Sequence, residues 1–174
     1  MVYERNITIP EGVKLERKDG SLSVSGEKGA SERVFIYPHV MLVVSADAVK
    51  VSTESKRKKD RAVVGTWTSH INNMIKGVKE GYEYKLKIVY SHFPMSVVVK
   101  DAVVEIKNYL GSKDLRFSKV VGDTKVNVKK EDIVVSGVNK EDVGQTSANL
   151  EKSCIPKNKD RRCFQDGIYL VARD

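Results

Sequence analysis

The sequence of 174 residues contains only two cysteines, Cys154 and Cys163, and no Cys-x-x-Cys pair. This scarcity argues against a zinc knuckle and against a framework of disulfides, so both thiols are expected to be reduced. No apolar run approaches the roughly 18 residues that a membrane helix needs. The first residues also lack the basic, then apolar, then small-residue succession of a secretory signal. We therefore expect a cytoplasmic protein that does not enter a membrane.

Motifs for catalysis are also missing. The three histidines, His39, His70 and His92, are scattered, and none has a neighbour at the spacing of metal ligands or of a nucleophile and its base. There is no Gly-rich phosphate loop, no Gly-x-Ser-x-Gly turn and no acidic metal triplet. We expect no catalytic residues, no metal, no cofactor and no small-molecule substrate. The alternative is an enzyme with a cleft between domains, which would require ionisable groups to converge there.

Positive charge, in contrast, is abundant. Lys and Arg number 31 against 23 Asp and Glu, which gives a net charge of +8. Such an excess favours a polyanionic partner through neutralisation of phosphates, although charge alone does not establish one. The excess is shared, because residues 1–80 contain 14 basic and 10 acidic residues and residues 81–174 contain 17 and 13. The positions of the charges must therefore identify the binding surface.

The first half of the chain has the pattern of hairpins followed by a helix. Alternating apolar residues on either side of Asp19-Gly20 predict a hairpin that ends near Gly26, and residues 40–45 and 49–53 predict a second pair of strands. The period then changes to that of a helix capped by Asp60 and ended by Gly81. The apolar stripe of this helix consists of Val64, Trp67, Ile71, Ile75 and Val78.

The second half repeats this order at a distance of about 80 residues. A long alternating strand with Tyr84, Leu86, Ile88 and Tyr90 on one face opens it. Strand pairs follow at residues 97–99 with 103–108 and at residues 126–128 with 133–136. Asn139 is then predicted to cap a second helix, in which Asp142 occupies the third position and Val143, Leu150 and Cys154 form the apolar stripe. Cys154 is thus expected to be a small buried core residue.

The repeat predicts an α+β protein with two similar domains from an internal duplication, each a small, mainly antiparallel sheet packed on one helix. The expected boundaries are residues 1–80 and 81–174, joined by a short connection at Gly81.

Two basic clusters are candidates for binding phosphate. Lys56 to Arg61 lies between a strand and a helix, where it is either a phosphate-binding patch or a solvated turn. The second cluster follows Pro156 and contains Lys157, Lys159, Arg161 and Arg162, directly before Cys163-Phe164-Gln165-Asp166-Gly167-Ile168-Tyr169.

This second cluster, which we call the C-terminal segment (Lys157 to Tyr169), combines guanidinium donors with aromatic rings that can stack on unpaired bases. Gly167 is expected to let the backbone approach a ligand closely. The alternative interpretation is that Phe164, Ile168 and Leu170 form one more buried strand. Both interpretations are compatible, because alternate residues of a strand face opposite sides.

Four motifs in this order resemble the archaeal branch of the family of large-subunit ribosomal protein six, the L-six family. They are GTWTSHINNMIKGVKEGYEYKLKIVYSHFPM from Gly65, KNYLGSK from Lys107, VGQTSANLE from Val143 and RRCFQDGIY from Arg161. The similarity extends over essentially the whole chain and includes the duplication. Cys163 departs from the family pattern, which usually has an aliphatic or basic residue there.

The resemblance implies a structural protein of the large ribosomal subunit that binds 23S-type rRNA near the stalk base and the sarcin-ricin loop, next to other ribosomal proteins, and that supports translation. It implies RNA contacts by Lys157, Lys159, Arg161, Arg162, Phe164, Gln165, Gly167 and Tyr169, with further contacts by Ser91, His92 and Lys113. It does not extend securely to Lys56–Arg61. The alternative function is a free-standing RNA-binding or chaperone-like protein outside the ribosome.

Overall fold

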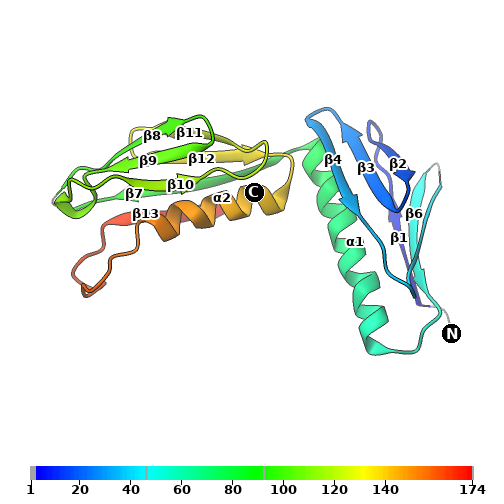
Figure 1. Cartoon of the computed structure of the whole chain (residues 1–174). Helices are drawn as coiled ribbons and strands as arrows, with labels where there is room; N and C mark the ends of the chain where they lie inside the picture. The colour runs from blue at the N-terminus through cyan, green and yellow to red at the C-terminus, as the bar shows by residue number, and fades with distance from the viewer. Residues whose placement is uncertain (1–2, 46, 92, 174) are drawn as a thin grey trace. The chain divides into compact units, whose positions relative to one another are not determined.

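The computed structural model describes residues 3–45, 47–91 and 93–173, which contain short antiparallel strands and two α-helices (Figure 1). The chain divides into two units, Met1–Gly81 and Tyr82–Asp174. Each unit combines antiparallel sheets with one helix, which confirms the predicted α+β class. His92, one of the predicted RNA contacts, lies outside the described residues.

Unit 1 contains two three-stranded sheets, ordered β1-β6-β5 and β2-β3-β4. Their strands are β1 (Tyr3–Thr8), β2 (Lys14–Lys18), β3 (Ser21–Gly26), β4 (Gly29–Val34), β5 (Met41–Val44) and β6 (Ala48–Thr53). The predicted hairpin is β2-β3, and its turn residues Asp19 and Gly20 both have positive φ, as a tight two-residue turn requires. The predicted pair at residues 40–53 is β5-β6.

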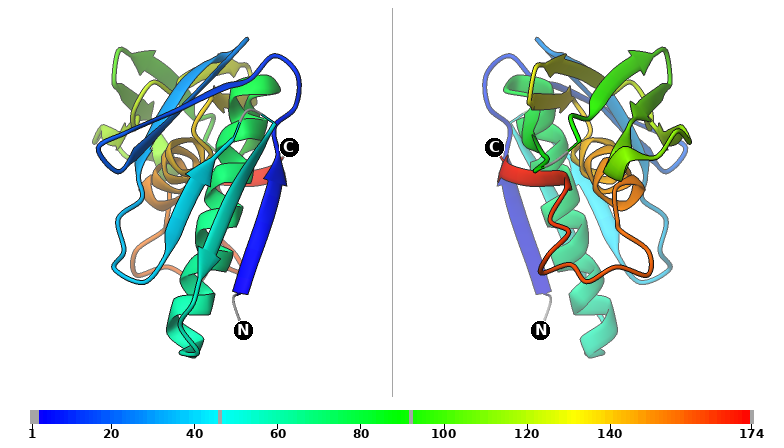
Figure 2. Two further views of the ribbon diagram at one scale, coloured as in Figure 1. Left: turned by 90° about the vertical axis from the view of Figure 1, so that its right-hand side faces the viewer. Right: turned by 90° about the vertical axis from the view of Figure 1, so that its left-hand side faces the viewer.

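Helix α1 (Lys58–Lys79) lies along the strands of unit 1 and contacts β1, β3 and β6 (Figures 1 and 2). All five residues of its predicted apolar stripe are buried, and Trp67 packs edge-on against Phe35 with ring centroids 5.3 Å apart. This packing confirms the stripe as the inner face of the helix.

The predicted start of this helix was wrong. The helix begins at Lys58, and Asp60 lies within its first turn instead of capping it. Asp60 is buried, and its carboxylate accepts a hydrogen bond of 3.0 Å from the hydroxyl of Tyr37. The carboxylate thus has a partner far away in the sequence. Lys58 to Arg61 of the basic run belong to the helix and not to a loop.

Unit 2 repeats the pairing pattern of unit 1. Its strands are β7 (Tyr82–Val89), β8 (Ser96–Lys100), β9 (Val103–Lys107), β10 (Arg116–Lys119), β11 (Lys125–Lys129), β12 (Asp132–Gly137) and β13 (Gly167–Arg173), with a 3-10 turn η1 (Tyr109–Gly111). They form the sheets β11-β12-β7-β13 and β10-β9-β8. The order β1-β6-β5 thus corresponds to β7-β12-β11, and β2-β3-β4 corresponds to β8-β9-β10. Strand β13 is the addition, and it pairs with the other edge of β7.

Helix α2 (Lys140–Ser153) packs against β7, β10, β12 and β13. Its predicted cap is confirmed, because the Asn139 side chain accepts from the backbone N–H of Glu141 at 3.0 Å and donates to Asp142 at 2.9 Å. Val143, Leu150 and Cys154 are buried in the core of unit 2. Burial raises the pKa of the Cys154 thiol, as expected for a core residue.

Two further features of the structure differ from the prediction: the extent of the inner face of β7, and the number of sheets in each unit. Tyr90 does not continue the inner face of β7, because the strand ends at Val89 and Tyr90 is exposed. Each unit also contains two small sheets where one was predicted. The turns between successive strands identify hairpins, but the sequence pattern does not show which hairpins join in one sheet.

Candidate RNA-binding surface

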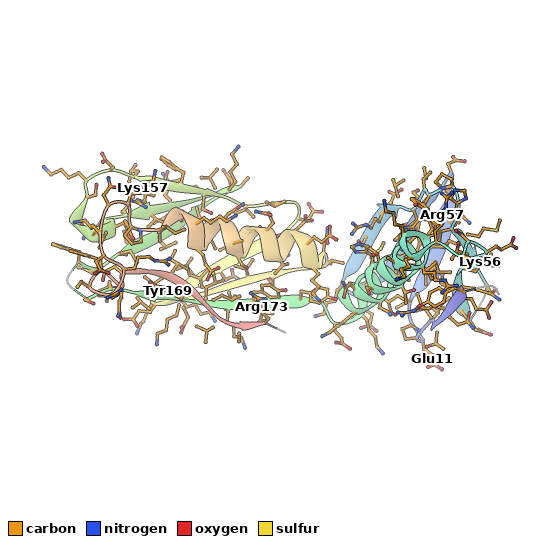
Figure 3. The ribbon with its side chains drawn as sticks, turned by 90° about the horizontal axis from the view of Figure 1, so that it is seen from below. Glu11, Lys56, Arg57, Lys157, Tyr169 and Arg173 are labelled. Atoms are coloured by element: carbon orange, nitrogen blue, oxygen red, sulfur yellow. The ribbon has the colours of Figure 1, made fainter. Side chains whose placement is uncertain are left out.

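The chain between α2 and β13 forms a loop, residues 154–166, which we call the C-terminal loop; its two end residues are buried and most of the residues between them are exposed. Four predicted cations, Lys157, Lys159, Arg161 and Arg162, are exposed on it, as is Gln165. Figure 3 shows Lys157 extending from this loop and Tyr169 further along, on β13. Of the predicted residues of the C-terminal segment, all but Gly167 are therefore exposed.

Asp160 gives the loop its local conformation. Its carboxylate accepts from the backbone N–H of Arg162 at 2.9 Å, and its carbonyl oxygen accepts from the N–H groups of Cys163, at 3.2 Å, and Phe164, at 2.9 Å. The Gln165 amide donates to the carbonyl of Arg162 at 3.2 Å. These bonds form a tight turn that presents the neighbouring cations outward.

The two aromatic rings of the segment are held differently. Phe164 is 40% exposed, and the ammonium group of Lys159 lies 4.4 Å from the centroid of its ring. Tyr169 is 39% exposed on the outer face of β13, while its neighbours Ile168 and Leu170 point inward, Ile168 being buried and Leu170 packing against the core. The Tyr169 hydroxyl donates to the carbonyl of Gln165 at 2.8 Å. The interpretation as a strand is thus correct for Ile168 and Leu170, whereas Phe164 lies before β13 and is not buried. The exposed ring of Tyr169 on the other face leaves the RNA-binding interpretation open as a prediction.

Gly167 does not offer its backbone to a ligand, contrary to the expectation from the sequence. It is buried, and a Cβ added there would lie 3.3 Å from the Tyr169 ring. The absence of a side chain at this position therefore makes room for the ring of Tyr169.

Both ends of the C-terminal loop are attached to Tyr109, a buried residue of η1. Its hydroxyl donates to the carbonyl oxygens of Cys154, at 2.6 Å, and of Asp166, at 3.3 Å. The Arg116 guanidinium lies 4.2 Å from the centroid of the Tyr109 ring and donates to the carbonyl of Ser153 at 2.7 Å. Burial, above all, raises the pKa of Tyr109 from 10.0 to about 12, so the hydroxyl remains a donor at alkaline pH values at which an exposed tyrosine ionises.

The other predicted contacts lie on loops around this base. The Ser91 backbone N–H donates to the buried carboxylate of Asp166 at 3.0 Å, which joins the end of β7 to the end of the C-terminal loop. Lys113 is exposed on the loop after η1. The 3-10 turn η1, which precedes that loop, is attached to the β7-β8 connection, because Asn108 donates to the carbonyl of Pro94 at 3.0 Å and Phe93 covers Gly111.

Two other kinds of candidate site to consider in the described part of the chain are clusters of metal-binding residues and free cysteines. Among residues 3–45, 47–91 and 93–173, no three His, Cys, Asp or Glu side chains come together as a metal site. Of the cysteines, Cys154 is buried and Cys163 is exposed, and both are free. No helix in the same residues has the length and apolar character needed to span a membrane.

Comparison with known proteins identifies the family. The model of the family "Ribosomal protein L6" matches residues 9–81 and 93–167, one match in each unit. The "Large ribosomal subunit protein uL6" of Methanosarcina mazei is 49% identical over 169 residues, covering 97% of this chain and 96% of the relative. The proteins of the same name from Staphylothermus marinus and Methanobrevibacter smithii are 49% and 47% identical, with 97% of this chain covered in both and 93% and 94% of the relatives.

The chain belongs to the ribosomal protein L6 family. This confirms the resemblance inferred from the four motifs. The two separate matches agree with the duplicated pairing order of the strands. L6 proteins are structural and are not enzymes, in agreement with the expectation from the missing motifs.

Within this L6 chain, sequence reasoning missed the residues that hold the surface in place. Tyr109 and Asp166 lie inside the quoted motifs KNYLGSK and RRCFQDGIY, but their partners are 45 and 75 residues away in sequence. Glu151 was missed as well, although its carboxylate accepts from the backbone N–H of Leu170 at 2.9 Å and so connects α2 to β13. Asp166, an acidic residue just after the basic run, is a local signal in the sequence, whereas the residues next to Tyr109 in the sequence do not indicate its role.

Proposed function

We propose that this chain is a structural constituent of the large ribosomal subunit, in the cytoplasm, and that its second unit binds large-subunit rRNA through the C-terminal segment. Membership of the L6 family and the names of its relatives support the ribosomal role. The observation that carries the RNA contact is the exposed group of Lys157, Lys159, Arg161 and Arg162 on a loop attached at both ends to Tyr109.

The chemistry of this loop suits an RNA backbone. Arginine guanidinium groups form paired hydrogen bonds with phosphate oxygens, and each neutralised phosphate releases counterions. The exposed faces of Phe164 and Tyr169 add flat apolar surface against which unpaired bases can stack. Because its turn is formed within the chain, the loop loses little conformational entropy when it binds.

We assign Ser91 and Lys113 to the border of this surface, in agreement with the loops that connect them to its base. We also propose that the two units are two separate domains and that the second domain contains the residues that contact RNA. A place near the stalk base and the sarcin-ricin loop, next to other ribosomal proteins, follows from the family resemblance and belongs to the proposal as well.

Charge reversal in the loop tests the RNA contact. The double substitution Arg161→Glu and Arg162→Glu is expected to weaken binding to a large-subunit rRNA fragment and to reduce the magnitude of the salt slope by about one to two. The matched control is Lys14→Glu with Lys28→Glu, two exposed lysines of unit 1 that give the same change of net charge. Equal effects of the two double variants would contradict the placement of the contact.

A cosedimentation experiment tests the role itself. A ribosomal constituent is expected almost entirely in 50S-type particles that survive moderate salt. A mostly free pool would instead support the alternative, an RNA-binding or chaperone-like protein that acts outside the ribosome.

A further inference from the structure

The outer face of sheet β10-β9-β8 in unit 2 exposes large apolar side chains. Phe117 is 59% exposed and Val98 40%, and both point away from the core, because their strand neighbours alternate with buried or partly buried residues. Leu115, just before β10, is 47% exposed. Exposed apolar residues are ordinary when isolated, but a group on one face of one small sheet indicates a contact surface.

The strand register places lysines around these apolar residues. Val98, Glu105 and Phe117 form one row across the sheet, and Lys100, Val103 and Lys119 form the next. Lys107 lies on the opposite side of Glu105 along β9 and points to the same outer face. We call Val98, Lys100, Glu105, Lys107, Phe117 and Lys119 the lysine-rimmed face. Its single acidic residue is neutralised within the sheet, because the Lys100 ammonium lies 2.9 Å from the Glu105 carboxylate.

The duplicated fold provides an internal comparison. In the corresponding sheet β2-β3-β4 of unit 1, the central row is Glu16, Ser23 and Glu32. Glu32 therefore occupies the position of Phe117, and Glu16 the position of Val98. Both glutamates are exposed. The fold thus does not require an aromatic residue at the position of Phe117. Lysines that only protect the edge of a sheet from pairing would not require an exposed aromatic residue beside them either.

From this arrangement we infer that the lysine-rimmed face is a second RNA contact, at which an unpaired base stacks on Phe117 while Lys107 and Lys119 neutralise the adjoining phosphates. Antiparallel sheets with an exposed aromatic ring between cations bind single-stranded RNA in this manner. The excess of positive charge on the face favours RNA over a protein partner. The inference rests on the RNA-binding role proposed above but uses none of the residues of the C-terminal segment.

A fluorescence titration of the full chain tests the stacking directly. The natural tryptophan, Trp67, is buried in unit 1, so its emission is insensitive to a ligand on unit 2. The indole introduced by Phe117→Trp is expected to be quenched when a short oligouridylate binds, while wild-type emission stays constant. If anisotropy shows that the oligouridylate binds and the introduced indole is not quenched, the inference is overturned.

An affinity measurement provides the second test. Phe117→Glu introduces the residue type that unit 1 tolerates at the same place, so the variant should fold. It is expected to bind the oligouridylate at least about five-fold more weakly, since one stacked base is worth on the order of 1–3 kcal/mol. The control Val43→Glu makes the same charge change at a residue of unit 1 that is 52% exposed, and should leave the affinity within about two-fold.

The two RNA contacts can fail independently. If the Arg161→Glu and Arg162→Glu variant keeps its rRNA affinity while Phe117→Glu loses oligouridylate binding, the C-terminal segment is wrongly placed and the lysine-rimmed face stands. If Phe117→Glu keeps both RNA affinities but no longer enters 50S-type particles, the face contacts a protein, and the inference made here is wrong.

Discussion

The hydroxyl of Tyr109 lies 2.6 Å from the carbonyl oxygen of Cys154, the residue at which the chain leaves α2 and enters the C-terminal loop. The same hydroxyl reaches the carbonyl of Asp166, where the loop ends. One buried side chain therefore closes the loop at its base. The exposed cations therefore belong to a loop whose two ends are fixed to the core of unit 2, and this is the physical basis of the RNA contact proposed for this surface.

The substitution Tyr109→Phe tests whether Tyr109 fixes the two ends of the loop. It removes the donor and leaves two carbonyl oxygens without their partner, which is expected to lower the free energy of unfolding by about 1–2 kcal/mol. Urea denaturation measures this loss, and hydrogen exchange should show faster exchange of the amides of Cys163 and Phe164. The control is Tyr90→Phe, because the Tyr90 hydroxyl is on the surface, 3.5 Å from Glu131. Equal stability of the two variants would show that Tyr109 does not hold the loop.

A second prediction concerns alkaline pH. Burial raises the pKa of Tyr109 from 10.0 to about 12, so between these values the unfolded chain has released a proton that the folded chain keeps. The stability that Tyr109 contributes is fully present below about pH 10 and is lost as pH rises towards 12. The loss amounts to at most about 1.4 kcal/mol per pH unit. In urea titrations above pH 10, the wild-type chain should therefore lose stability more steeply than the Tyr109→Phe variant. Parallel curves would contradict the prediction.

The third prediction compares two glycines of unit 1. A Cβ at Gly26 would lie 2.9 Å from the backbone carbonyl oxygen of Val78 in α1, whereas a Cβ at Gly65 would meet nothing within 4 Å. Gly26→Ala is expected to destabilise the chain by about 1–3 kcal/mol, because the strand and the helix must separate. Gly65→Ala is expected to stabilise it by about 0.5–1 kcal/mol through helix propensity. Urea denaturation of both variants measures these changes in the free energy of unfolding. A Gly26→Ala variant as stable as the wild-type chain would contradict the close packing of β3 on α1.

Much of the fold could be predicted from the sequence, because its periodicity is local. The apolar stripe of α1, the Asn139 cap and the hairpins β2-β3, β5-β6, β8-β9 and β11-β12 each depend on residues within a few positions of one another, and all were predicted. Strands β1, β4 and β10 were not predicted. Asp60 shows where this reasoning fails. A cap and a first-turn acid look alike in the sequence, and the bond from the hydroxyl of Tyr37 to Asp60 joins residues 23 positions apart, which the local pattern does not reveal.

The candidate surface was predictable to a similar extent. The exposed cations could be recognised as a charge run after a helix, since such runs remain in solvent. The roles of Tyr109 and Asp166 could not, because they depend on contacts between distant parts of the chain. Gly167 was misinterpreted for a similar reason. The ring that fills the space beside it belongs to Tyr169, two residues along, and only the geometry of β13 brings the two together.

Closure of the loop at Tyr109 has a mechanical consequence. The attachment points at Cys154 and Asp166 lie on either side of residues 155–165, and Tyr109 belongs to the core of unit 2. A force that a bound RNA exerts on the loop is therefore carried by the core of unit 2, and not only by the pairing of β13 with β7.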